Sequence, residues 1–122
     1  TSIHSDLGVF FADHGLFDKA EKELLKAIEY TDNLGGIHNN WGYYYHKKGD
    51  FEKAVGAFRK AISLSPEQHS YYNNLGFTLK RLGRKKEAME AFRQSIAIKS
   101  NQPEIAEQIR QNDVPFKQNE LL

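Results

Sequence analysis

The feature that most constrains this 122-residue chain is a pattern of residues that recurs every 34 positions. Three columns of identical small residues share the period: Gly8, Gly42 and Gly76; Gly15, Gly49 and Gly83; Ala20, Ala54 and Ala88. Large apolar residues recur at the same interval, in the columns Leu7/Trp41/Leu75, Phe11/Tyr45/Leu79 and Leu24/Phe58/Phe92. A fixed period without insertions is typical of stacked structural repeats. We therefore predict three units, covering residues 1–34, 35–68 and 69–102.

The apolar spacing inside each unit is helical. In the first unit Leu7 and Phe11, and then Ala20, Leu24 and Ala27, follow the steps of three and four residues that one buried helix face requires. A glycine separates the two runs, at a place where a helix end commonly needs a residue with positive φ. Each unit is predicted to be a pair of short antiparallel helices, called A and B here.

Signals for helix starts are also present. Asp18 with Glu21 predicts a capping box at the first B helix, and Asp50 is placed to cap the second. Ser65 followed by Pro66 predicts the start of the third A helix.

The pattern resembles the tetratricopeptide repeat, a helix–turn–helix unit of 34 residues. The resemblance is carried by the A-helix segments Leu7-Gly8-x2-Phe11, Trp41-Gly42-x2-Tyr45 and Leu75-Gly76-x2-Leu79, and by the B-helix segments Ala20-x3-Leu24-x2-Ala27, Ala54-x3-Phe58-x2-Ala61 and Ala88-x3-Phe92-x2-Ser95. It implies an all-α, right-handed α-solenoid. The 35-residue pentatricopeptide repeat, which binds RNA, is disfavoured by the period of 34.

The period ends after residue 102. Ile105 and Ile109 predict one more helix over 103–112, with a polar remainder that suits the capping helix of a solenoid. Residues 113–122 are expected to form a flexible tail. Because the chain begins with Thr1 and not with Met, we expect a processed protein or a piece of a longer one.

The resemblance implies that the A helices line a concave groove, and helical spacing independently puts the same positions on one stripe. The predicted ligand-binding residues are Asn39, Asn40, Tyr43, His46, Lys47, Asn73, Asn74, Phe77, Lys80 and Arg81. Side-chain amides offer both donors and an acceptor, so Asn40 and Asn74 with their neighbours can hold a peptide backbone. Tyr43 and Phe77 are candidate aromatic anchors. Lys47, Lys80 and Arg81 would meet an acidic group.

Charge is unevenly distributed along the chain. The whole sequence has a net charge of +1, which excludes a bulk polycation for nucleic acid. Residues 68–101, however, hold seven Lys and Arg against two Glu, a local charge of +5. This favours an acidic partner segment or a carboxylate terminus. The cluster over 80–86 has little aromatic interleaving, so nucleic acid is an unlikely partner.

Some tetratricopeptide domains clamp the tails of chaperones, and the resemblance allows a test of that role. The clamp needs Lys or Arg and Asn at five A-helix positions, which here are Ser5, Val9, Asn40, Ser70 and Asn74. Only Asn40 fits, so no chaperone-tail clamp is expected.

Several other kinds of site are not expected. The chain has no Cys, and His38 and His46 lack a third ligand nearby, so no metal site is predicted. Nothing positions a substrate beside Asp6 and Asp13, so no catalysis and no cofactor are expected. No apolar run is long enough for membrane insertion and no leader is visible, which weakly favours the cytoplasm.

These observations predict a non-catalytic protein–protein interaction module, an adaptor or scaffold that binds a peptide in its groove. Two alternatives stay open. The chain could self-assemble as a homo-oligomer, by head-to-tail stacking or by insertion of its tail into a groove. It could also be the targeting module of a longer enzyme.

Overall fold

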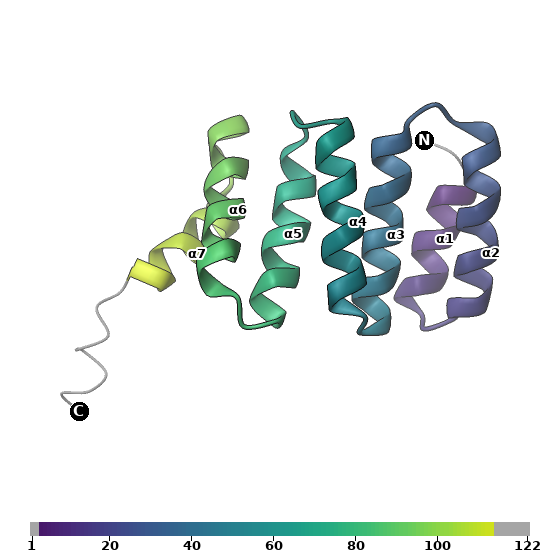
Figure 1. The fold of residues 1–122 in the computed structure, drawn as a ribbon, viewed down its shortest axis with the longest axis horizontal. Helices are drawn as coiled ribbons and strands as arrows, with labels where there is room; N and C mark the ends of the chain where they lie inside the picture. Colours follow the sequence, from purple (N-terminus) through teal and green to yellow (C-terminus); the bar gives the residue numbers. More distant parts are fainter. Residues whose placement is uncertain (1–2, 114–122) are drawn as a thin grey trace.

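The computed structural model describes residues 3–113, and every regular element in that range is helical. The elements are α1 (Ile3–Asp13), α2 (Phe17–Ala27), a 3-10 turn (Ile28–Tyr30), α3 (Leu34–Lys48), α4 (Phe51–Leu64), α5 (His69–Arg81), α6 (Lys85–Ile98) and α7 (Pro103–Asp113). Helices α1 to α6 run up and down side by side along the long axis, and α7 lies obliquely beside α6 at the far end (Figure 1). The predicted all-α repeat solenoid is confirmed. The predicted tail, apart from Asp113 at the end of α7, lies outside the described residues.

Close contact between a glycine and a large side chain sets the spacing within each helix pair. A Cβ atom added to Gly42 would lie 2.5 Å from the ring of Phe58, and one added to Gly76 would lie 2.5 Å from the ring of Phe92. Both rings are almost fully buried, at 1% and 0% exposure. The recurrence of glycine every 34 residues thus reflects a lack of space, because any side chain would push the A and B helices apart.

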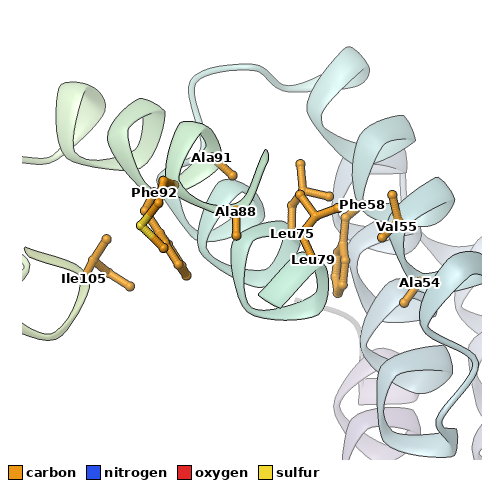
Figure 2. Packing of buried hydrophobic residues seen from close by; sticks show 10 residues of the cluster. Ala54, Val55, Phe58, Leu75, Leu79, Ala88, Ala91, Phe92 and Ile105 are labelled. Atoms are coloured by element: carbon orange, nitrogen blue, oxygen red, sulfur yellow. The ribbon is translucent and has the colours of Figure 1, made fainter. Parts of the chain in front are cut away.

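The larger of two hydrophobic clusters runs from α4 to α7. Its buried residues are Ala54, Val55, Phe58, Leu75, Leu79, Ala88, Met89, Ala91, Phe92 and Ile105. Figure 2 shows Phe58 and Leu79 meeting between α4 and α5, and Ile105 facing Phe92 from the last helix. By burying Ile105, α7 covers apolar surface of α6 that would otherwise meet water.

The predicted side-chain caps at the starts of the B helices are absent. Backbone hydrogen bonds close the turns before these helices instead. Helix α2 begins at Phe17 without a side-chain cap, so Asp18 and Glu21 form no capping box, and Asp50 precedes α4 without a capping bond. The backbone amide of Asp50 is itself bonded to the carbonyl of Tyr45 at 2.9 Å, following Gly49 with its positive φ of 91°.

The predicted helix start at Ser65 is also wrong. Residues 65–68 form a turn in which the amide of Gln68 donates to the carbonyl of Ser65 at 3.3 Å, and α5 begins at His69. The side-chain cap that the structure does show is Asn33, whose side-chain oxygen accepts from the amide of Gly36 at 3.0 Å at the start of α3.

Two glycine-to-alanine substitutions should have opposite effects on stability. Gly76→Ala inserts a methyl group into the ring of Phe92 and should lower the free energy of unfolding by about 1–3 kcal/mol. Gly56, in the middle of α4, has no atom within 4 Å of an added Cβ, so Gly56→Ala should raise it by about 0.5–1 kcal/mol through helix propensity. Urea unfolding followed by circular dichroism measures both. Equal effects of the two substitutions would contradict the close-contact explanation.

Candidate functional site

The A helices α1, α3 and α5 form one face of the molecule, called the A-helix face below, and it carries two hollows. The first, the polar cleft, has a volume of about 300 Å³ and is lined from all three helices. Its lining includes Ser5, Asp6, Val9, Gly36, Asn39, Asn40, Ser70 and Tyr71. The second, the basic cleft, is an open hollow of about 570 Å³ lined by His46, Phe77, Lys80 and Arg81. Both clefts are flanked by the neighbouring A helices α3 and α5.

Two of the four predicted asparagines bond to each other. The amide nitrogen of Asn74 on α5 donates to the side-chain oxygen of Asn39 on α3 at 2.9 Å. The pair joins neighbouring repeats, yet it leaves the amino group of Asn39 and the oxygen of Asn74 available. Asn40 lines the polar cleft and is partly buried. Asn39 and Asn40 therefore both line the polar cleft, and Asn74 is joined to it through its bond to Asn39.

The fourth asparagine is used elsewhere. Asn73 donates to the side-chain oxygen of Gln102 at 2.8 Å, and Gln102 in turn donates to the hydroxyl of Ser95 at 2.9 Å. The oxygen of Asn73 is buried and has no hydrogen-bond partner within residues 3–113. Asn73 therefore links α5 to the segment before α7, and its amide is not open to either cleft.

Tyr43 and Lys47 are tied to the first helix by Asp13. The hydroxyl of Tyr43 donates a short hydrogen bond to the carboxylate of Asp13, and the Lys47 ammonium lies 3.7 Å from the same carboxylate. Burial, followed by the hydrogen bond to Asp13 and its charge, raises the pKa of Tyr43 to about 12. The Lys47 nitrogen also lies 5.7 Å from the centre of the Tyr43 ring. Sequence spacing had not indicated this cluster, because Asp13 lies 30 residues before Tyr43 and reaches it only through stacking of the repeats.

His46 is held in one orientation by Thr78. The hydroxyl of Thr78 donates to the carbonyl of Asn74 at 2.8 Å, so it accepts from Nδ1 of His46 at 2.8 Å. The proton of the neutral ring therefore sits on Nδ1, and Nε2 is left as an acceptor. Burial lowers the pKa of His46, and the positive charges of Arg81 and Lys47 lower it further.

The basic cleft combines an exposed ring with two cations. Phe77 is 36% exposed and packs edge-on against Phe92, with ring centres 5.0 Å apart. The Arg81 guanidinium lies over the ring of Phe51 at 4.8 Å, and the Lys80 ammonium donates to the side-chain oxygen of Gln108 at 2.6 Å. Within the described range neither cation forms an ion pair with a carboxylate. This arrangement fits an apolar side chain next to an anionic group.

Two searches of the described part of the chain gave negative findings. Residues 3–113 contain no group of three His, Asp or Glu side chains placed to hold a metal ion. None of the helices in this range combines the length and apolar character that a membrane crossing requires.

Comparisons with known proteins agree with this architecture. A family model described as TPR repeat matches residues 42–83, and one described as tetratricopeptide repeat matches residues 69–102. No curated protein sequence matches the chain significantly.

Similar solved structures include three helical-repeat proteins. The first TPR of Spaghetti (RPAP3) bound to the HSP90 peptide SRMEEVD has a TM-score of 0.79 at 17% identity, covering 89% of each chain. PilF of Pseudomonas aeruginosa has a TM-score of 0.77 at 26% identity, covering 96% of this chain and 53% of its own. MamA has a TM-score of 0.75 at 24% identity, covering 87% of this chain and 62% of its own. The chain thus spans less than two thirds of the PilF and MamA chains.

The sequence models and the helical architecture support the same conclusion. Tetratricopeptide repeats build protein–protein interaction modules, and the chain belongs to the tetratricopeptide-repeat family.

Proposed function

We propose that the chain binds an acidic peptide segment across its A-helix face and has no catalytic role. The observation that carries the proposal is the basic cleft, where Lys80 and Arg81 flank the exposed ring of Phe77 without a carboxylate partner among residues 3–113. An acidic side chain or a chain terminus would pair with the two cations while its apolar neighbour packs on Phe77.

The polar cleft would hold the backbone of the same segment. Asn40 and the amino group of Asn39 line this cleft and offer hydrogen-bonding groups that match a peptide bond, while Asn74 holds the oxygen of Asn39. Tyr43 and Lys47 take a different role in this proposal, because Asp13 already engages both. They position α3 against α1. Asn73 likewise positions the chain before α7.

The Spaghetti (RPAP3) domain supports an acidic ligand class, since its peptide SRMEEVD contains three acidic residues. The residues at the clamp positions argue against that same peptide here. Ser5, Val9 and Ser70 line the polar cleft where a clamp would need cations or an amide. We therefore propose an acidic segment with an adjacent large apolar side chain instead of a chaperone tail.

Removal of the two cations should weaken the binding of acidic peptides. Peptides selected from a random twelve-residue phage library on the wild-type chain are expected to be rich in Asp, Glu and apolar residues. Arg81→Gln or Lys80→Gln should reduce the affinity of a selected peptide by about 1.5–3 kcal/mol, the typical value of a hydrogen bond to a charged group. Lys99→Gln, an equal charge change on an exposed residue outside both clefts, is the control. Selection of basic or neutral peptides, or equal losses in all three variants, would contradict the proposal.

Binding of a carboxylate should also depend on pH through His46. A carboxylate seated beside the ring would raise the lowered pKa of His46, so binding takes up a proton and tightens as the pH falls through the range around the ordinary histidine value of 6.5. His46→Gln should make the affinity nearly independent of pH in this range. Titration calorimetry in two buffers of different ionisation enthalpy would measure the proton uptake.

The unliganded chain should show the opposite trend. Its unfolded state binds a proton at His46 near pH 6.5, whereas the folded state binds it only at lower pH, so stability falls as the pH drops through 6.5. His38, whose pKa is lowered by burial and by Lys60, adds to this trend but lines neither cleft. For the complex with the acidic peptide, an affinity that rises with pH would show that His46 does not face the ligand.

Self-assembly is a second candidate, favoured by an apolar surface at the α1 end. Ile3 is 69% and Phe10 is 52% exposed, whereas Ile37 and Tyr44, their counterparts one repeat later, are each 3% exposed. The exposed side chains of α7 include Glu104, Arg110 and Gln111, so the opposite end is polar. Head-to-tail stacking would thus join unlike surfaces, and two α1 ends are better matched. Tail insertion involves residues 114–122, outside the described range.

Sedimentation equilibrium distinguishes this candidate from a monomeric module. If self-assembly operates, the average mass should rise with concentration, and Phe10→Asp should abolish the rise because it buries a charge in the contact. Ile98→Asp, which alters another exposed apolar residue, serves as the control. A constant monomer mass would eliminate the candidate.

A further inference from the structure

A third cleft opens on the side of α5 that faces away from the A-helix face. It has a volume of about 370 Å³ and lies between α4, α5 and α6. Leu75 and Leu79 contribute its floor from α5, with Ile62 from α4 and Ala91 from α6. Because successive residues on a helix are separated by about 100°, Leu75 and Leu79 point away from Phe77. A ligand in this cleft would therefore leave the basic cleft free.

The cleft exists because the third repeat carries smaller residues than the second. Leu75 and Leu79 correspond, one period earlier, to Trp41 and Tyr45. At that earlier place Trp41 packs on Tyr44 and Tyr45 of its own helix, with centres 5.3 Å and 5.9 Å apart, and Trp41 and Tyr45 also pack against the cluster that holds Leu24 of α2. Two leucines occupy less volume than an indole and a phenol, so a shallow cleft remains above them, although their neighbours bury Leu75 to 5% and Leu79 to 1% exposure.

The rim of the cleft is negatively charged. Arg59 on α4 and Glu87 on α6 form an ion pair at 3.0 Å, and both side chains are about half exposed. Such an exposed pair contributes little free energy, so it can exchange partners readily. Glu90, also on the rim, forms no ion pair in the described part of the chain, which leaves one uncompensated carboxylate at the mouth.

We propose that this cleft binds a partner segment in which a large apolar side chain is next to a Lys or Arg. The apolar side chain fills the space above Leu75 and Leu79, as Trp41 does within the chain at the preceding junction. The cation pairs with Glu90 and competes with Arg59 for Glu87. The rim and the basic cleft have opposite charges, so the two faces select different segments.

The test uses two peptides of equal size and opposite charge, acetyl-Lys-Phe-Lys-amide and acetyl-Glu-Phe-Glu-amide. Methyl-resolved NMR of the full chain would follow Ile62, Leu75, Leu79 and Ala91 as each peptide is added. The Lys peptide should shift these methyl signals in a saturable way, and the Glu peptide should not. Shifts at the basic cleft caused by the Glu peptide report separately on the function proposed above, so one proposal can fail without the other.

Two variants and one control sharpen the result. Leu75→Trp fills the cleft with the residue that the preceding repeat uses, so it should preserve the fold and weaken the Lys peptide at least tenfold. Glu90→Gln, which leaves the packing unchanged, should weaken it several-fold and keeps the test valid if Leu75→Trp perturbs folding. Lys99→Gln, on an exposed residue that lines none of the three clefts, should leave it unchanged. Absence of saturable shifts, equal shifts with both peptides, or full binding by Glu90→Gln would overturn the proposal.

Discussion

The contact between a glycine on each A helix and a large side chain on the paired B helix is the constraint on which the rest of the structure depends. With the ring of Phe58 against Gly42 and that of Phe92 against Gly76, the two helices of a pair lie as close as their side chains permit. That distance fixes where α3 and α5 present their outer residues. Both clefts of the A-helix face therefore depend on residues that no ligand would touch.

The fold could be predicted because its determinants are periodic and local. A glycine or alanine that recurs every 34 residues marks the close approach, and the helical spacing of Leu7 and Phe11 marks the buried face. The helix starts could not be predicted as well. Ser65 and Pro66 are compatible both with a helix start and with a turn. In the structure they belong to a turn, which is closed by the hydrogen bond from the backbone amide of Gln68 to the carbonyl of Ser65.

The candidate site was only partly predictable. Phe77, Lys80 and Arg81 line one hollow because their spacing places them on one stripe of a single helix, which a sequence reveals. The engagement of Tyr43 and Lys47 by Asp13, and of Asn73 by Gln102, depends on how separate helix pairs stack. Residues about 30 positions apart meet there, and the spacing within a helix carries no information about such contacts. That Leu75 stands where the preceding repeat has Trp41 could be read in the sequence, but only the stacked repeats show that Leu75 lines a cleft.

The asparagines show how one side-chain type serves structure and recognition together. The bond between Asn39 and Asn74 joins successive A helices, while each amide keeps hydrogen-bonding groups for another partner. The amide nitrogen of Asn73, in contrast, donates to Gln102 in the segment before α7, and its oxygen is buried. The same residue type at adjacent positions therefore belongs to two different networks.

The aromatic junction around Trp41 also determines how the unfolding of this protein can be observed. Trp41 is the single tryptophan of the chain, and it packs beside Tyr44, which shares a cluster with Ala12, Ala20 and Leu24 of the first helix pair. Since each repeat of a solenoid contacts only its neighbours, its parts need not unfold together. Indole fluorescence therefore reports the joint between the first and second repeats alone, whereas the far-ultraviolet dichroism sums all the helices. The separation between the two melting curves would measure how independently that joint opens.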